Sequence, residues 1–421
     1  MRVRRIGQCI LLVWSLCACN GKTLDSVFGS TNNNQLNASS CSTQSLSTMA
    51  TQFIVHWEDG HVSTEQSENI EMLKAKFVAP HLAAIHHVEP DQVVAVRGPL
   101  VGQRVAASAV ATNLNTWGPD TIQASAAWAQ GSSGQGVLVG IVDAAVDYTQ
   151  PQLAGQLAPN LAEINGKTGI DDDGNGFVDD FYGWDFVGNG NNPSALVSPH
   201  NEHGTHVSGI VAADGSKGPI QGVAPQAKII PVNFMDATGS GNLSKAIQAL
   251  QYAASRGAKV INASWGGSQC STTLQSVMAA LAQQNVTVVV AAGNSGLNLD
   301  NSPDYPASYN FATQLNVASS NQSDFLDTWS NFSFNVVHLA APGDTILSTV
   351  PGGQAFMSGT SMAAPFVTGT AALLLSARPA ATALEIRQAL LAGTDNLGLA
   401  TTSRGRLNVP NALSSLKALR P

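Results

Sequence analysis

Continuous apolar runs alternate with helical stretches from residue 137 onward, and this alternation limits the fold more than any other feature of the sequence. The apolar runs are typical of buried strands, because no polar face interrupts them. Such strands separated by helices favour an α/β fold, with a doubly wound parallel sheet and helices on both faces. The expected strands cover 137–143, 227–235, 259–265, 286–293 and 314–319, and the expected helices cover 203–213, 243–256, 272–285, 361–377 and 382–392.

The composition agrees with a packed protein that does not bind nucleic acid. Only 11% of the residues are charged, against roughly 25% in typical soluble domains. The formal net charge is −8, and the sequence contains no basic cluster that would attract phosphates. No run of about 20 apolar residues occurs, so we expect no membrane-spanning helix.

The first 18 residues are typical of a signal peptide, because three arginines precede a short apolar run. That run ends in Leu16-Cys17-Ala18-Cys19, which resembles the lipobox of bacterial lipoproteins. Cys19 would then be lipidated and would anchor the protein to a membrane. The alternative is ordinary secretory cleavage near Ala18. We therefore expect an extracytoplasmic protein, either a lipoprotein of the bacterial cell envelope (outer membrane or cell surface) or a secreted one.

The next segments differ in composition. Residues 19–51 are rich in Asn, Ser and Thr, as in a flexible linker. Residues 52–104 form a small α+β candidate, with strands expected at 53–57 and 92–98 around a helix at 65–77. Residues 105–421 contain the α/β pattern. Only Cys41 and Cys270 follow the lipobox; they either pair with each other or remain as two separate thiols.

Four polar residues stand where a parallel sheet places its functional sites, beyond the carboxyl ends of strands or at helix starts. They are Asp143, His203, Asn294 and Ser361. Each type alone is weak evidence, since Asp often caps a helix and a core His is often structural. Together they suit nucleophilic catalysis, in which His accepts the proton of the Ser hydroxyl and a buried carboxylate orients the His. The amide of Asn294 and the N–H of Ser361 supply donors for an oxyanion.

The sequence resembles the subtilisin-like serine proteases, also called subtilases. The resemblance rests on "VLVGIVD", "HGTHVSG", "SWGG", "VVVAAGNSG" and "GTSMAAP", in that order, within roughly residues 116–416. It implies that Asp143 orients His203, that His203 is the acid and base, and that Ser361 attacks the peptide carbonyl. It also implies that Asn294 is the oxyanion donor. Two edges would bind substrate as an added strand, and they are formed by Ser264, Trp265 and Gly266 and by Gly239, Ser240 and Gly241.

The sequence departs from the family at a few positions. Ala144 and Ala145 follow Asp143 where relatives have Ser or Thr and then Gly, so a hydroxyl that would support the carboxylate is missing. Gln150 and Gln152 stand where relatives often have His and Asp, which makes one family calcium site doubtful. The resemblance implies apolar or aromatic substrate side chains before the cut.

The resemblance also gives residues 52–104 a role. In size and order they resemble the family's inhibitory propeptide, which assists folding, occupies the cleft and is then removed. We expect the enzyme, a zymogen, to cut itself between about 98 and 116.

A separate acidic stretch, 169–186, begins like a calcium-binding EF-hand loop. Asp171, Asp173, Asn175 and Gly176 match, but Tyr182 stands where the bidentate Glu belongs. Structural calcium and a metal-free acidic turn are both open, so the metal ligands stay unknown. The chemistry itself requires no cofactor.

We therefore expect a secreted or surface-anchored serine endopeptidase that cuts proteins or peptides through an acyl-enzyme. Its partners would be its substrates, its own propeptide and a membrane, with no nucleic acid among them. The alternative is a weak or inactive subtilase-like domain that binds peptides, which Ala144 and Ala145 suggest.

Overall fold

The computed structural model describes residues 22–28, 41, 51–96, 103–105, 117–194 and 202–419, and of 103–105 the backbone alone. The chain divides into two compact units, which we describe separately. Unit 1 comprises Met1–Gln35 and Ser42–Asp91, and unit 2 comprises Leu36–Cys41 and Gln92–Pro421. The signal peptide and Cys19 lie outside the described residues, and the domain boundaries given above remain predictions.

Unit 1 is a three-stranded antiparallel sheet with a helical segment. The strand order is β2-β1-β3. An apolar cluster that includes Phe53, Leu73, Val78 and Ile85 forms its core. Its elements are α1 (Leu24–Val27), β1 (Gln52–Trp57), β2 (Val62–Gln66), α2 (Ile70–Leu73), the π-helical turn η1 (Lys74–Val78), α3 (Ala79–His81) and β3 (Ile85–Pro90).

Two expectations for this region need correction. The helix expected at 65–77 begins only at Ile70, because Val62–Gln66 pairs with β1 as a strand. Asn69 caps this helix by accepting a hydrogen bond from the backbone N–H of Met72. The strand expected at 92–98 is the short β4 (Val93–Ala95), which belongs to unit 2.

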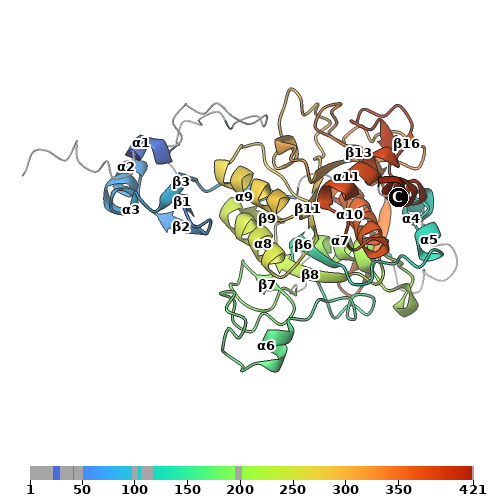
Figure 1. Cartoon of the computed structure of the whole chain (residues 1–421), viewed down its shortest axis with the longest axis horizontal. Helices are drawn as coiled ribbons and strands as arrows, with labels where there is room; N and C mark the ends of the chain where they lie inside the picture. The colour runs from blue at the N-terminus through green and yellow to red at the C-terminus, as the bar shows by residue number, and fades with distance from the viewer. Residues whose placement is uncertain are drawn as a thin grey trace, which may run out of the picture. The chain divides into compact units, whose positions relative to one another are not determined.

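Unit 2 is built on one large sheet (Figure 1). Its strand order is β16-β17-β13-β12-β11-β10-β6-β8-β7, and all its pairs are parallel except β16 with β17. The α/β fold with a parallel sheet is therefore confirmed. The strands of this sheet are β6 (Leu138–Asp143), β7 (Trp184–Asp185), β8 (Lys228–Asn233), β10 (Val260–Ala263), β11 (Thr287–Ala291), β12 (Gln314–Ser320), β13 (Leu339–Pro342), β16 (Asp395–Asn396) and β17 (Gly405–Arg406).

Helices pack on the sheet with little space between. Figure 1 shows α8 and α9 beside each other on one side of β6 and β11, with α7 and α10 on the other. Gly140 of β6 explains the close approach of α8, because a Cβ there would lie 2.8 Å from the Cβ of Ala253. The helices are α4 (Trp117–Thr121), α5 (Ser125–Trp128), α6 (Leu161–Asn165), α7 (Glu202–Ala212), α8 (Leu243–Ser255), α9 (Thr272–Gln283), α10 (Thr360–Ala377), α11 (Ala383–Ala392) and α12 (Val409–Leu419), with short 3-10 turns η3 (Gly215–Lys217) and η4 (Ala307–Tyr309).

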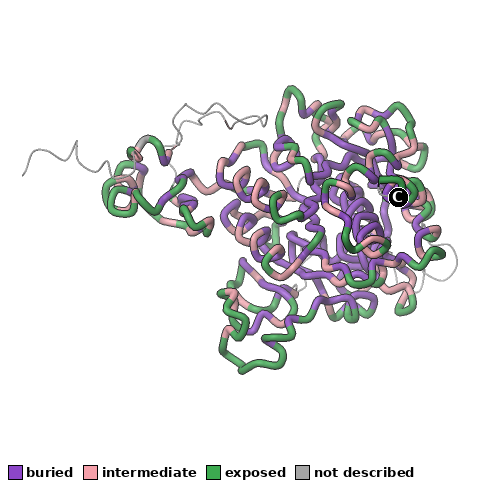
Figure 2. The backbone as a smooth tube through the Cα atoms, viewed as in Figure 1, coloured by how far each residue is buried: buried purple, intermediate pink, exposed green. Residues whose placement is uncertain are grey.

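Helix α10 runs through the core of unit 2. It contacts β10, β11, β12 and β13 as well as α7, and Figure 2 shows it almost wholly buried. Within the part of the chain described, it is the one helix long and apolar enough to cross a membrane, but 89% of that stretch is buried inside the fold. An apolar helix without a polar face belongs in a core, and the burial of α10 agrees with that rule.

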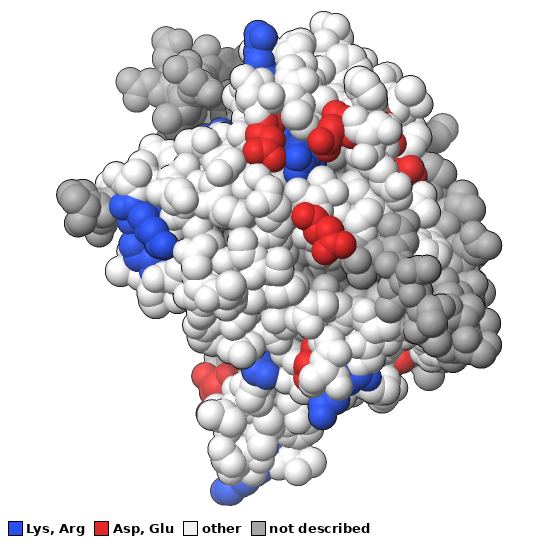
Figure 3. All heavy atoms as spheres, turned by 90° about the vertical axis from the view of Figure 1, so that its right-hand side faces the viewer, with Lys and Arg blue, Asp and Glu red and all other residues white. Residues whose placement is uncertain are grey.

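Two small sheets complete unit 2. One has the order β14-β15-β5, with β14 (Ile346–Val350), β15 (Gly353–Met357) and β5 (Gln103–Val105). The other pairs β4 with β9 (Ser240–Asn242). Figure 3 shows one face of the molecule on which charged side chains are few and the two signs are interspersed, as the 11% charged content leads us to expect.

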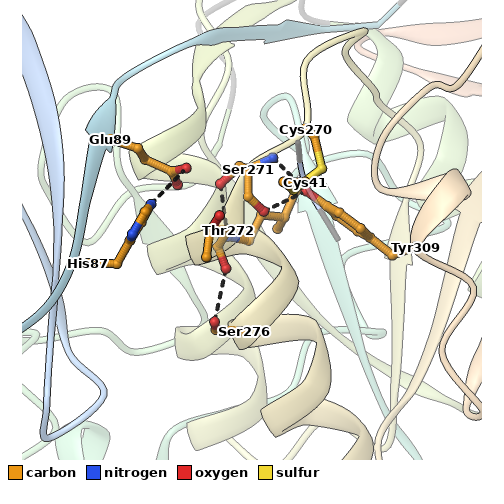
Figure 4. Close-up of a disulfide and its surroundings, with 9 residues drawn as sticks. Cys41, His87, Glu89, Cys270, Ser271, Thr272, Ser276 and Tyr309 are labelled. Atoms are coloured by element: carbon orange, nitrogen blue, oxygen red, sulfur yellow. Dashed lines mark hydrogen bonds and ion pairs between the residues drawn. A yellow bond between two sulfur atoms is a disulfide. The ribbon is translucent and has the colours of Figure 1, made fainter. Parts of the chain in front are cut away.

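A disulfide joins Cys41 to Cys270 (Figure 4), which decides between the two states left open above. Cys270 directly precedes Ser271, which caps α9 by accepting from the N–H of Leu274. The hydroxyl of Tyr309 bonds to both the N–H and the carbonyl of Ser271. The disulfide therefore links Cys41 to the start of α9, which these hydrogen bonds hold in place.

Candidate active site

The four residues singled out in the sequence all lie at strand ends or helix starts of unit 2. Asp143 is the last residue of β6, and Asn294 follows β11. His203 and Ser361 each lie in the first turn of a helix, α7 and α10 respectively, and these two helices pack against each other. Parallel strands end at a common edge, so residues that are far apart in sequence meet there.

Asp143 and His203 form a buried hydrogen-bonded pair. The Nδ1 of His203 lies 2.6 Å from Oδ1 of Asp143, and the two side chains are 2% and 0% exposed. The N–H of Ala144 also donates to Oδ1, at 2.6 Å. Oδ2 of Asp143 is buried without a hydrogen-bond partner among the described residues. The carboxylate thus orients the imidazole. Ala144 offers no hydroxyl to Oδ2, and no other group among the described residues bonds to that oxygen.

The hydroxyl of Ser361 points to a backbone carbonyl and not to the imidazole. Its Oγ donates to the carbonyl of Ser264 at 3.2 Å. The Nε2 of His203 is buried and has no hydrogen-bond partner within the described part of the chain. With Nδ1–H bonded to Asp143, Nε2 is the nitrogen that can accept a proton. Transfer from Ser361 requires its hydroxyl to turn away from Ser264, and catalytic hydrogen bonds often form only when substrate is bound.

The amide of Asn294 is oriented by its neighbour in α10. Its Oδ1 accepts hydrogen bonds from the N–H of Thr360 at 2.8 Å and from the hydroxyl of Thr360 at 2.9 Å. With Oδ1 held, the Nδ2 group is directed away from Thr360, and Asn294 lines the same pocket as Ser361. The first turn of α10 also leaves backbone N–H groups outside the helical bonding pattern, with partial positive charge. This arrangement suits the stabilisation of a developing negative charge.

A series of hydrogen bonds holds the start of α10 in place, and a proline in the helix makes the first of these bonds necessary. Pro365 has no N–H, so the carbonyl of Ser361 has no helical partner four residues on. The hydroxyl of Ser264 donates to that carbonyl instead, at 3.0 Å. Asn262 of β10 then donates to Ser264 Oγ, and Thr368 donates to Asn262. These hydrogen bonds hold Ser361, the candidate nucleophile, to the end of β10.

The two proposed substrate edges lie on either side of a segment of the chain itself. Ala95 of β4 exchanges two hydrogen bonds of 3.1 Å with Gly266. On its other side β4 pairs with β9, Val94 opposite Gly241 and Ala95 opposite Ser240, and the N–H of Val96 donates to the carbonyl of Gly239. The structure therefore places a strand between the edges at Gly239–Gly241 and Ser264–Gly266. Trp265 is itself buried, and its Nε1 donates to the carbonyl of Val142.

Two buried histidines of unit 2 have a packing role. Burial lowers the pKa of His206 to about 3, and its Nε2 donates to the carbonyls of Ile346 and Ala355. Burial also lowers the pKa of His338 to about 3, and its Nδ1 accepts from the N–H of Asn316. Both residues are held neutral by the fold, and neither touches the Asp143–His203 pair by a hydrogen bond.

The acidic loop forms a compact cluster that fits a hard cation. Glu163, Asp171 and Asp173 place one carboxylate oxygen each within 4.8 Å of one another. Backbone N–H groups orient the carboxylates: Gly176 donates to Asp171, and Asp172 donates to the buried Glu163. Calcium prefers oxygen ligands, and carboxylates are common among them. The donor set thus fits calcium, and it includes Glu163, which the sequence pattern did not indicate.

The sequence comparison identifies a known family. The profile of the subtilase family matches residues 134–409. Thermitase from Thermoactinomyces vulgaris is 37% identical over 302 residues, which cover 70% of this chain and 95% of thermitase. A thermophilic serine proteinase from Bacillus sp. (strain AK1) is 38% identical over 304 residues, 71% of this chain and 67% of that protein. The crystal structure of a cold adapted subtilisin-like serine proteinase superimposes with a TM-score of 0.54 at 30% identity, covering 66% of this chain and 90% of that one.

Proposed function

Because the chain belongs to the subtilase family, it is a subtilisin-like serine peptidase, and we propose that it cuts internal peptide bonds through Asp143, His203 and Ser361. The observation that carries this proposal is the buried bond between His203 Nδ1 and Asp143 Oδ1, which leaves Nε2 as the proton acceptor. A carboxylate in this position fixes the imidazole tautomer and stabilises the imidazolium that forms.

The proposed reaction follows from the positions of these groups. The hydroxyl of Ser361 turns from Ser264 to His203, gives its proton to Nε2 and attacks the substrate carbonyl carbon. The N–H of Ser361 and Nδ2 of Asn294 stabilise the resulting oxyanion. The imidazolium then protonates the leaving amine, and the acyl group stays on Ser361 Oγ. A water molecule, deprotonated by Nε2, hydrolyses the acyl-enzyme and restores the hydroxyl.

We further propose that β4 marks the end of an inhibitory propeptide. The pairing of β4 with both edges supports this proposal. An extended peptide binds to a protein in the same way when it adds a strand to a sheet edge. A segment bound in this way blocks other peptides from the same edges. After the cut, release of β4 from these edges would then be needed for full activity.

Location outside the cytoplasm is a proposal with two supports. One is the sequence of residues 1–19, and the other is the disulfide between Cys41 and Cys270, since disulfides persist mainly in oxidising compartments. Lipidation of Cys19 would anchor the protein to a membrane. We also propose that the cluster of Glu163 in α6 with Asp171 and Asp173 in the acidic loop binds structural calcium. This calcium would take no part in peptide-bond hydrolysis.

Labelling with a serine-directed phosphonate tests the proposed chemistry. We expect the wild-type enzyme to cleave casein and to be labelled on Ser361. Ser361→Ala should lose labelling and roughly 10⁶-fold in kcat, and it should accumulate as the uncut precursor. Ser414→Ala, which removes an exposed hydroxyl in α12, is the matched control and should behave as wild type. Labelling of Ser361 without turnover of any peptide would favour the peptide-binding alternative.

A further inference from the structure

A buried carboxylate lies in the pocket beside Ser361. The pocket is lined by Ser361, Asn294, Trp265, Gly266, Gly293 and Asp304, among others. Asp304 is the one ionisable residue among the described residues that line it, and it is 6% exposed. No sequence pattern indicates Asp304, because it lies in a loop after β11 and outside the motifs that carry the family resemblance.

Two glycines make room for this carboxylate. A Cβ at Gly266 would lie 2.5 Å from Oδ1 of Asp304, and a Cβ at Gly293 would lie 3.7 Å from Oδ2. The carboxylate therefore lies between the substrate edge at Gly266 and the turn that precedes Asn294. Its backbone is held firmly: the N–H of Asp304 donates to the hydroxyl of Ser308, and Tyr305 exchanges two hydrogen bonds with Gly267.

The register of β4 shows which substrate residue reaches the pocket. Ala95 lies opposite Gly266 in an antiparallel pair. A substrate strand that continues this antiparallel register would place the residue two positions further along opposite Ser264, whose carbonyl accepts from Ser361 Oγ. A substrate bound in this register brings that residue to Ser361, and its side chain is the one next to the pocket. It is the residue on the acyl side of the bond to be cut.

We propose that Asp304 is a specificity-determining residue and selects lysine or arginine at the position before the cut. This inference rests on the proposed function, and it departs from the apolar preference that the family resemblance implies. The carboxylate would attract a cationic side chain that enters the pocket and would repel an acidic one. The sequence of the chain agrees, since Val96 is followed by Arg97, a residue outside the described ones.

Peptide substrates that differ only in the residue before the cut test the proposal. For the mature wild-type enzyme we expect kcat/KM to be at least about tenfold higher with Arg or Lys than with Leu, and lowest with Glu. Asp304→Asn should lower kcat/KM for the Arg substrate by on the order of 10²-fold and should abolish the preference for Arg over Leu. Asp300→Asn removes the same charge from the same loop outside the pocket and should keep the wild-type ranking.

The outcomes separate this inference from the proposed function. An active wild-type enzyme that prefers Leu or Phe over Arg overturns the role of Asp304 alone. So does an Asp304→Asn variant that keeps the preference for Arg. The ranking of substrates by the wild-type enzyme decides the question even if the variant does not fold. Absence of both cleavage and phosphonate labelling in the wild-type enzyme would instead contradict the proposed function.

The disulfide carries a second, independent inference. Cys41 precedes the propeptide-like segment in the sequence, and Cys270 follows 229 residues later; both belong to unit 2 (Figure 4). A cut anywhere between about 97 and 116 therefore breaks the chain inside the loop that the disulfide closes. We propose that the cut enzyme remains one covalent molecule of two chains, in which the segment from residue 19 onward stays attached to the catalytic unit.

Electrophoresis of the cut enzyme with and without reductant tests this attachment. We expect one band without reductant, at the size of the uncut protein, and two bands after reduction. Cys41→Ser should give two bands under both conditions, and Ser414→Ala should match the wild type. Two bands from the wild-type enzyme without reductant, with both termini intact by mass spectrometry, would overturn the inference.

Discussion

Gly204 lies so close to Ala144 that a Cβ at position 204 would stand 2.1 Å from the carbonyl oxygen of Ala144. This close approach lets the start of α7 meet the end of β6. His203, the residue before Gly204, thereby reaches Asp143. The absence of one side chain thus sets the geometry of the Asp–His pair.

Gly204→Ala should therefore damage activity more than stability. The added methyl group pushes α7 away from β6, and we expect a loss of about 1–3 kcal/mol in the free energy of unfolding. A displacement of about 1 Å at His203 should cost on the order of 10²-fold in kcat. Gly155→Ala is the control, since nothing lies within 4 Å of a Cβ there. Unchanged kcat in Gly204→Ala would show that the close contact does not position His203.

The chain of hydrogen bonds at Pro365 predicts the effect of Ser264→Ala. Loss of the hydroxyl leaves the carbonyl of Ser361 and the amide of Asn262 without their partner, which should cost about 1–3 kcal/mol of stability. The nucleophile should also be less well placed, so kcat should fall while KM changes little. Thr368→Val, one step further along the chain, removes only one bond and should lower stability by about 1 kcal/mol. Equal kcat in wild type and Ser264→Ala would contradict this positioning role.

Stability should fall as the pH is lowered from about 6 to 4. The pKa values of His206 and His338 are lowered from 6.5 to about 3, so the unfolded chain binds protons first as the pH drops below 6.5. Each histidine then removes about 1.4 kcal/mol per pH unit. Burial raises the pKa of Asp327 to about 6, and its folded form binds a proton first, which opposes one histidine in the same range. The urea-unfolding midpoint of the Ser361→Ala chain measures the net loss.

Asp327→Asn provides the control for this pH dependence. The variant removes the opposing carboxyl while keeping its shape, so the fall in stability with acid should become steeper. The histidines would not be the cause if the midpoint stayed constant from pH 6.5 to 4 in both proteins.

Removal of calcium should destabilise the enzyme if the acidic loop binds it. We expect EDTA to lower Tm and added calcium to restore it, since a ligand that binds only the folded state stabilises that state. Asp171→Asn should lose this response, whereas Asp120→Asn, in α4, should keep it. A Tm that is independent of calcium in the wild-type enzyme would favour the metal-free acidic turn.

The register of β4 sharpens the expected site of self-cleavage. We expect the first cut after Arg97, at the lower end of the region 98–116 that the sequence suggested. Mass spectrometry of the new amino terminus should find Gly98 at the earliest time point. Arg97→Leu should slow the cut, whereas Arg104→Leu should not. A first product that begins elsewhere would show that β4 is not bound as a substrate strand.

The sequence predicts the central sheet well because its strands are continuous apolar runs. Residues 137–143, for example, correspond to β6 within one residue. The strand Ile85–Pro90 was missed, since its two histidines and one glutamate hide any apolar pattern. The motifs predict the contact between Asp143 and His203, and the structure contains it. Contacts between distant residues, such as Asp304 beside Gly266 or Ser264 with the carbonyl of Ser361, leave no mark on local patterns and require coordinates.

Strand β4 has a consequence for how fast the enzyme matures. Because β4 pairs with both edges in its own chain, the proposed self-cleavage would be unimolecular, and its half-time should not change when the precursor is diluted. The rate of maturation would then be independent of concentration, and a dilute enzyme would mature as quickly as a concentrated one.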